Sequence, residues 1–271
     1  MKVVEKDKVI SGMLRDELKR CQEMLESLGK SVSELPKGSI SERKKRYKNN
    51  NDNIFPSEVQ ELLQAFFSVG FFDESLLIGS WVMLLYQEAF GIPYVLRTMD
   101  IDFAVKFVLS DRAQKVDLEK VITDLGYIPI VMQSGIRRFT RENFTVEFVA
   151  HRKDGRDDQV VSIRKWNITA SPLPFVDILL SFPFTADFGN FKVRAPLPEA
   201  FFVHKLVTAQ RRRGESKKDK DLDQCAAIAR QLDPNRLDSV MRSLKLSKKT
   251  QKALRASCEV IDFPPQQLGL K

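Results

Sequence analysis

The sequence LLIGSWVMLLYQEAFGIPYVLRTMDIDFAV occupies residues 76–105 and predicts a strand, a helix and a second strand. Residues 76–78 form an apolar run typical of a strand, and residues 81–90 carry apolar side chains at helical spacing. The DIDFAV segment that closes the run predicts the second strand. Because alternate residues of a strand share one face, Asp100 and Asp102 should point in the same direction.

The pairing of Asp100 and Asp102 predicts a bound cation. Two neighbouring carboxylates repel each other, and burying them without a counter-charge is costly, so a divalent cation with oxygen ligands usually resolves the conflict. Gly79 and Ser80 fall where the first strand ends and the helix begins, a place with free backbone N–H groups that suits a phosphate. The run therefore indicates a nucleotide-dependent phosphoryl or nucleotidyl transferase.

Composition narrows the class of protein. The 271 residues can bury one sizeable core or two small ones, and 43% hydrophobic with 30% charged residues is ordinary for a soluble globular chain. A net charge of +8 favours polyanions such as RNA or nucleotides only weakly. No apolar run could span a bilayer, and MKVVEKDKV is unlike a signal peptide, so we expect a cytoplasmic protein without a membrane partner.

Cysteine and histidine contribute little to a predicted metal site. The three cysteines are too widely spaced for a zinc pattern or a disulfide framework, and two histidines exclude a histidine-rich site. A reducing compartment fits this usage. The residues concerned are Cys21, Cys225, Cys258, His151 and His204.

The chain divides into three predicted parts: an N-terminal helix with a basic linker over residues 1–53, a mixed α/β core over 54–195 and a helical region over 196–271. Apolar residues spaced by three or four predict one amphipathic helix over 8–30, which either packs on its own domain or binds a protein partner such as an antitoxin. The basic run at 41–53, SERKKRYKNNNDN, is either a solvated linker or a contact to an RNA backbone.

Further elements follow from local patterns. Helices are predicted from Pro56 onward, at 116–125, at 200–208, and from 216 to about 257 with breaks near residues 233–234 and 246–247. Strands are predicted at 127–132, 135–140, 144–150, 160–163 and 191–193, the second and third of these forming a hairpin.

Glu147 is the lone charge in the apolar strand FTVEFV, residues 144–149. If this strand lies beside the strand of Asp100 and Asp102, three carboxylates converge and can hold two divalent ions about 3.5–4 Å apart. One ion would lower the pKa of the attacking hydroxyl, and the other would hold the triphosphate and stabilise the leaving pyrophosphate. Alternatively, Glu147 faces solvent or pairs with Arg137 or Arg138 across the hairpin.

These motifs resemble a known superfamily. The order apolar-Gly-Ser, Asp-apolar-Asp and a later acid on a strand is similar to the nucleotidyltransferase fold, which includes DNA polymerase β. Residues 97–102, RTMDID, resemble its RT-x-D-h-D version. Three later segments resemble a mainly bacterial branch that is distantly related to the AbiEii-type abortive-infection toxins: ASPLPF (170–175), PLPEAFFVHKL (196–206) and KDLDQ (220–224).

The resemblance spans roughly residues 56–232 and implies an α+β fold. Its mixed β-sheet core would carry helices and be flanked by the N-terminal helix and the C-terminal helical region. The gap between Gly-Ser and Asp-x-Asp is longer than in the simplest superfamily motif, and this departure agrees with the narrower branch.

The resemblance also implies roles. Asp100, Asp102 and Glu147 would be the catalytic metal ligands. The nucleotide would be bound by Gly79, Ser80, Arg97, Thr98, Lys205 and Lys220, with the two lysines facing the triphosphate.

Several of these residues have structural alternatives. Arg97 fits equally well as an ion-pair partner that pins Asp100 or Asp102, and His204 fits a core histidine. Residues 211–213, RRR, fit a solvated helix end or a phosphate contact. We expect Trp81, Phe201 and Phe202 in the core.

The resulting hypothesis is a transferase that uses Mg²⁺ or Mn²⁺ to move a nucleoside monophosphate from an NTP such as ATP to a hydroxyl, with release of pyrophosphate. The acceptor could be an RNA 3′ end, a protein side chain or a small molecule, and a toxin acting on tRNA would use the basic surface. The alternatives are a non-catalytic RNA- or nucleotide-binding protein that retains the fold, and a toxin–antitoxin-type interaction protein.

Overall fold

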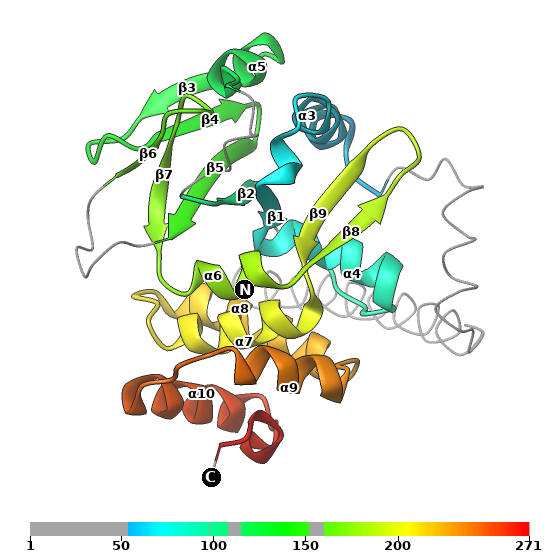
Figure 1. Ribbon diagram of the computed structural model, residues 1–271, viewed down its shortest axis with the longest axis vertical. Helices are drawn as coiled ribbons and strands as arrows, with labels where there is room; N and C mark the ends of the chain where they lie inside the picture. The colour runs from blue at the N-terminus through cyan, green and yellow to red at the C-terminus, as the bar shows by residue number, and fades with distance from the viewer. Residues whose placement is uncertain (1–53, 97, 108–114, 152–159, 271) are drawn as a thin grey trace, which may run out of the picture. The chain divides into compact units, whose positions relative to one another are not determined.

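A mixed β-sheet carries the motif strands. The computed structural model describes residues 54–96, 98–107, 115–151 and 160–270, and within this part seven strands form the sheet. Along its main path the strands run in the order β1, β2, β5, β4, β3, which are Ser75–Ile78, Asp100–Val105, Phe144–His151, Arg137–Arg141 and Ile128–Val131. Strand β7 (Ile168–Leu173) also pairs with β5, and β6 (Val161–Ile163) pairs with β7 (Figure 1).

The direction of pairing is mixed, as predicted for the core sheet. Strand β5 runs parallel to β2 and β7, whereas the other pairs in the sheet are antiparallel. A separate antiparallel hairpin is formed by β8 (Pro183–Asp187) and β9 (Lys192–Pro196). The α+β class is therefore confirmed.

One face of β2 and β5 packs into an aromatic core. Phe103 on β2 lies opposite Phe148 on β5, and their ring centroids are 5.8 Å apart. Phe66 and Phe71 pack onto this pair from helix α3 (Ser57–Ser68) and the short helix η1 (Phe71–Asp73). Since residues on either side of these phenylalanines along each strand point the other way, the acidic residues lie on the opposite face.

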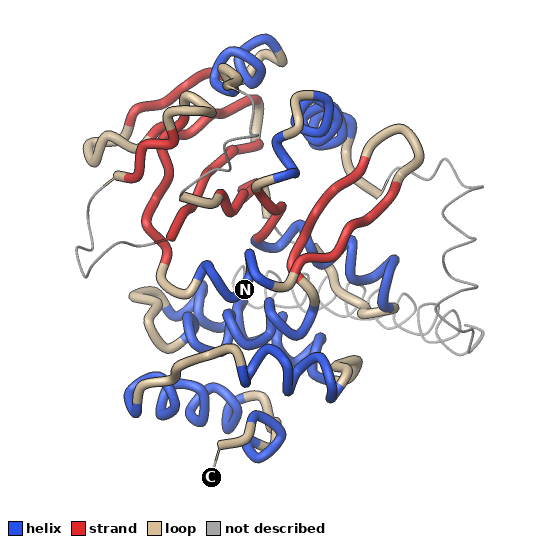
Figure 2. Tube along the Cα trace, in the orientation of Figure 1, coloured by secondary structure: helices blue, strands red, loops and turns tan. Residues whose placement is uncertain are grey.

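Helices account for the C-terminal part of the described chain, as Figure 2 shows. Helix α7 (Pro198–Ala209) is buried along its whole length and packs against α6, α8, α9 and α10. Those four helices are Val176–Ser181, Glu215–Ala229, Pro234–Arg242 and Lys248–Val260. The expected core residues Trp81, Phe201 and Phe202 are at most 2% exposed.

The predicted breaks in the helical region are confirmed, and capping explains them. The Asp233 side chain accepts N–H bonds from Asn235 and Arg236 and starts α9, with Pro234 at its first position. The Ser247 hydroxyl accepts the Thr250 N–H and starts α10. The remaining helices α4 (Val82–Phe90) and α5 (Leu118–Asp124) agree with the predicted positions.

Among the described strands and α-helices, two strands and one helix went unpredicted. Strand β7 contains Pro172, a residue that is disfavoured inside strands, and β8 starts at Pro183. Helix α6 has only six residues, too few for a helical period to be visible. Each of these elements is therefore positioned by packing or pairing with its neighbours in the fold, and its own sequence does not reveal it.

The described residues all belong to one compact unit of the chain. The helix expected at 8–30 and the basic run at 41–53 lie outside the described residues. The division at residues 53 and 195 stays a prediction. No described helix has the length and apolar character needed to cross a membrane.

Candidate functional site

Strand register brings the two acidic motifs together. Asp102 on β2 lies directly opposite Glu147 on β5, and Asp100 lies opposite Thr145. On the other side of β2, Asp102 lies opposite Ile78, the last residue of β1. The condition set by the sequence is therefore met: the strand of Glu147 is the neighbour of the Asp-x-Asp strand.

The backbone of Gly79 lies very close to the Asp102 carboxylate. Its φ angle is +69°, and a Cβ atom built on it would lie 2.2 Å from Oδ2 of Asp102. Only glycine tolerates both the left-handed conformation and the contact. Ser80 follows in η2 (Gly79–Trp81), which leads into α4, so the Gly-Ser turn lies against the acidic strand.

The carboxylates interact electrostatically. Burial raises the pKa of Asp102 above the ordinary value of 3.8; the nearby Lys205 ammonium opposes this shift, and the Asp100 carboxylate adds to it. Burial likewise raises the pKa of Glu147 above 4.5, with Arg138 opposing and Asp102 and Asp100 contributing. Each acid therefore lies within the field of another.

Glu147 has a protein partner. Its Oε1 lies 3.0 Å from Nε of Arg138, which is the cross-hairpin pair that the sequence left open. Among the described residues, no three His, Cys, Asp or Glu side chains are arranged to hold a metal as they stand. Asp100 and Asp102 form no ion pair with any described residue, and their hard oxygen donors are of the type that Mg²⁺ and Mn²⁺ prefer.

Helices α7 and α8 supply cations to the same place. Lys205 is ion-paired with Asp221, and Nε of Arg212 lies 2.8 Å from Oδ2 of Asp221. Burial works to raise the pKa of Asp221, but Lys205 and Arg212 outweigh it and lower that pKa. Burial, reinforced by Lys205, lowers the pKa of Lys220, while Asp100 and Asp102 oppose the change. Both predicted lysines therefore lie in the field of the acidic strand.

Sequence reasoning missed the contact between Gln224 and Ser80, as it missed the ion pairs of Asp221. Gln224, which is fully buried, donates from Nε2 to Oγ of Ser80 at 2.8 Å. The motif KDLDQ was recognised, but its glutamine received no role. The available signal was spacing: positions 217, 220, 221 and 224 share one face of α8, so that Gln224 belongs to the same polar stripe as Lys220.

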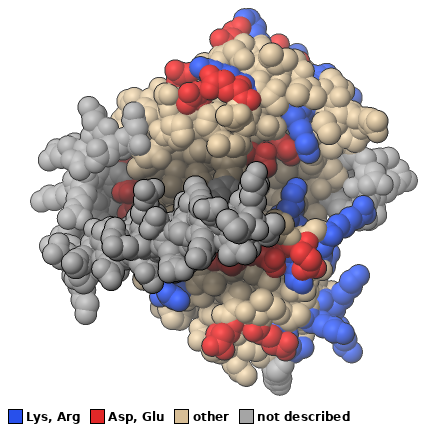
Figure 3. Space-filling model, turned by 180° about the vertical axis from the view of Figure 1, so that it is seen from behind, with Lys and Arg blue, Asp and Glu red and all other residues tan. Residues whose placement is uncertain are grey.

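The remaining motif residues are placed as follows. Thr98 Oγ1 accepts the Asp100 N–H at 3.3 Å, so it acts on the start of β2, whereas Arg97 lies outside the described residues. The arginines at 211–213 are exposed, and Arg211 lies over the Phe175 ring at 4.6 Å. Around the middle of the face in Figure 3, basic side chains lie beside acidic ones.

His204 is 4% exposed, and burial lowers its pKa to about 3. We expect its imidazole to stay neutral between pH 5 and 8, as in a core histidine. The unfolded chain takes up a proton below about pH 6.5, so stability should fall with decreasing pH from there to about pH 3, by at most about 1.4 kcal/mol per pH unit. Long-range ¹⁵N NMR checks the imidazole, with His151→Gln assigning the signals. Titration of His204 near pH 6.5 would contradict this.

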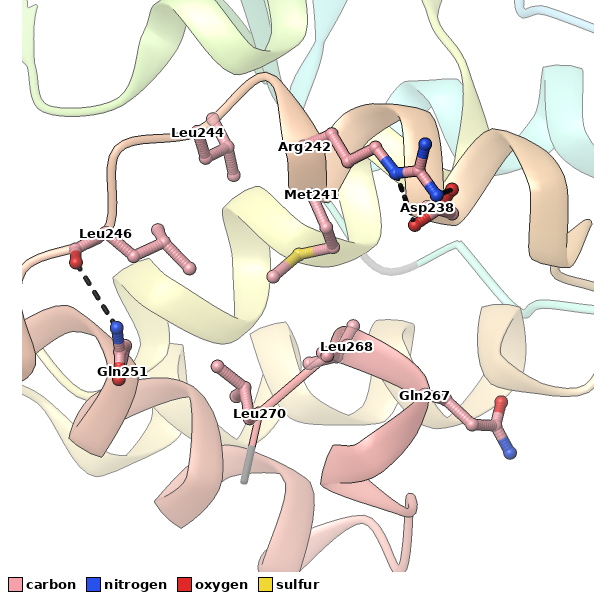
Figure 4. Close-up of a pocket in the computed structure, with 10 residues that line it drawn as sticks. Asp238, Met241, Arg242, Leu244, Leu246, Gln251, Gln267, Leu268 and Leu270 are labelled. Atoms are coloured by element: carbon pink, nitrogen blue, oxygen red, sulfur yellow. Dashed lines mark hydrogen bonds and ion pairs between the residues drawn. The ribbon is translucent and has the colours of Figure 1, made fainter.

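A separate cavity of about 300 Å³ lies at the C-terminal end of the chain, between α9, α10 and η3 (Pro265–Leu268). Met241, Leu244, Leu246, Leu268 and Leu270 form its apolar wall (Figure 4). It contains none of the residues predicted for catalysis or nucleotide binding, so it is not part of the carboxylate site.

Comparison with known proteins identifies the family of this chain. A protein-family model described as "Nucleotidyltransferase" matches residues 57–246. No curated protein matches the chain. Among solved structures, an antigenic nucleotidyltransferase-like protein from Paracoccidioides brasiliensis matches with a TM-score of 0.46 and 13% identity, over 82% of this chain and 94% of that one. The family match covers more than half of the chain and includes the Gly-Ser turn and all three acids, so the chain belongs to the nucleotidyltransferase family.

Proposed function

We propose that this protein transfers a nucleoside monophosphate from an NTP to a hydroxyl group and releases pyrophosphate. One observation carries the proposal: Gly79 lies against Asp102, which shares one face of β2 with Asp100. Glu147 lies directly opposite Asp102 on the neighbouring strand β5. A phosphate-binding turn beside paired carboxylates is the arrangement this chemistry needs.

Asp100 and Asp102 would hold Mg²⁺ or Mn²⁺. When bound, the metal would activate the acceptor hydroxyl and stabilise charge on the phosphates. Glu147 is proposed as a third ligand, and to bind the metal through Oε1 it must release Arg138. A divalent cation favours this exchange because it offers the carboxylate more charge than one guanidinium does.

The chain's own groups would position the nucleotide. The backbone N–H groups at Gly79 and Ser80 would bind phosphate oxygens. Lys205 and Lys220 would offset the negative charge of the triphosphate, with Asp221 holding Lys205 in place. Thr98 fixes the backbone of Asp100 and so contributes to nucleotide binding indirectly.

The test is a transfer assay with each labelled NTP, Mg²⁺ or Mn²⁺, and total RNA or cell extract as the acceptor source. We expect label to move to RNA or protein, or to a small molecule, and to stay in the NTP when the Asp100→Asn/Asp102→Asn protein is used. Transfer of label by that double variant would remove the carboxylates from the proposal. The assay also identifies the acceptor, including tRNA.

The Arg138–Glu147 ion pair favours one alternative, a non-catalytic RNA- or nucleotide-binding protein that keeps the fold. It predicts NTP or RNA binding without transfer in any acceptor mixture. Arg138→Met separates the two functions, because freeing Glu147 should strengthen metal binding at an enzyme site and change nothing at a site without metal. A protein partner for the N-terminal helix, as in a toxin–antitoxin pair, stays a separate prediction on residues outside those described.

A further inference from the structure

The Ser80–Gln224 contact joins the two halves of the site. Ser80 lies in the Gly-Ser turn after β1, and Gln224 lies 144 residues later on α8. Both side chains are at most 5% exposed. The bond therefore sets how the turn is held relative to the helix that carries Lys220.

The direction of this bond leaves one proton available. A serine hydroxyl has one proton to donate and two lone pairs with which to accept. Because the Gln224 amide donates to Ser80, it uses one lone pair of the Ser80 oxygen and leaves the hydroxyl proton unused. Within the described ranges no residue accepts the Ser80 proton, so it can be donated to a ligand beside the Gly-Ser turn.

The other end of Gln224 argues against a purely structural role. Its Oε1 is buried and has no hydrogen-bond partner among the described residues. A buried acceptor without a partner lowers stability, and an apolar side chain of the same shape would avoid that loss. The presence of an amide here despite that loss is explained by what its N–H group does to Ser80.

The geometry points to Gln224 as a positioning residue that orients the Ser80 hydroxyl to donate its proton to a phosphate oxygen of the bound triphosphate. This inference rests on the proposed nucleotidyl transfer and deepens it, because it assigns triphosphate binding to a hydroxyl that is polarised from α8. Gln224 acts through Ser80 and makes no contact with the reacting atoms.

The test measures binding of inorganic triphosphate with Mg²⁺ by calorimetry, in the full chain, for wild type, Gln224→Met, Ser80→Ala and the double variant. Each single change should weaken binding roughly tenfold, the worth of one hydrogen bond to a charged oxygen. The double variant should bind no more weakly than either single variant, because both changes remove the same interaction. Gln224→Glu, which would accept the Ser80 proton, should weaken binding at least as much as Gln224→Met.

Gln210→Met provides the matched control. Gln210 donates to Oγ of Ser257 at 3.1 Å, so this variant loses the same kind of bond between α7 and α10 without touching the Gly-Ser turn. It should bind triphosphate as the wild type does. A circular-dichroism melt confirms that each variant is folded, and the Met variants still decide the question if the Gln224→Glu protein does not fold.

Three results would overturn the inference: triphosphate binding by Gln224→Met within twofold of wild type, a further tenfold loss when Gln224→Met is added to Ser80→Ala, or no triphosphate binding by the wild type. Binding without transfer by the wild type would remove the proposed function, yet the four-variant comparison would still decide the role of Gln224. If the wild type transfers nucleotide but Gln224→Met binds triphosphate as tightly as the wild type, the proposed function stands and the role of Gln224 is removed.

Discussion

Asp102→Asn is expected to lower the rate of nucleotidyl transfer roughly a thousandfold or more. Asp102 lies between the Gly-Ser turn and Glu147, so its carboxylate is the acid best placed to join the phosphates to a metal. The asparagine amide has nearly the same shape as the carboxylate but no charge, so the variant tests the charge of Asp102 without changing the packing. Single-turnover rates with labelled NTP measure the effect, with Asp124→Asn on the surface of α5 as the control.

The same substitution should stabilise the metal-free protein. The folded-state pKa of Asp102 is raised above 3.8, so ionisation costs the folded state more than the unfolded state. We expect the melting temperature to rise at pH 7, because the variant removes a buried charge that the folded state holds at a cost. Below about pH 3.8 both states are protonated, so the difference between variant and wild type should shrink as the pH is lowered towards that value.

Two outcomes would contradict this assignment. Transfer within tenfold of wild type would show that Asp102 takes no part in the chemistry. A lower melting temperature at pH 7 would show that the carboxylate is held by favourable partners and is not under strain from burial. Loss of activity together with a gain in stability is the combination expected of a residue kept for function.

Gly79→Ala is expected to lower transfer at least about a hundredfold and to destabilise the fold. The added methyl group would lie 2.2 Å from Oδ2 of Asp102, so either the carboxylate or the end of β1 must move. A misplacement of about 1 Å at a reacting site can cost about a hundredfold in rate. The left-handed backbone adds strain of about 1–3 kcal/mol for any residue with a Cβ.

Gly269→Ala separates the two effects. Gly269 has nearly the same φ angle, +65°, but a Cβ atom there would meet nothing within 4 Å. This control should carry only the backbone strain and leave transfer unchanged. Thermal melts and transfer rates of both variants give the comparison. Equal losses of activity in the two would show that the contact with Asp102 is unimportant.

Short-range patterns in the sequence determined much of this protein. The alternation in DIDFAV places Asp100 and Asp102 on one face, because a strand has a period of two residues. Gly79 and Ser80 mark the strand-to-helix turn, and the caps at Asp233 and Ser247 end and restart helices. These features depend on residues a few positions apart, so they are visible without a fold.

Tertiary structure alone decided how those pieces meet. That β2 pairs with β5, in parallel and with Asp102 opposite Glu147, is set by the packing of the phenylalanines on the far face of the sheet. The choice of Arg138 over Arg137 as the partner of Glu147 and the bond from Gln224 to Ser80 are consequences of that register and of the seating of α8. Such contacts join residues up to 144 positions apart, and no local period encodes them, because their energy depends on which surfaces the whole chain can bury together.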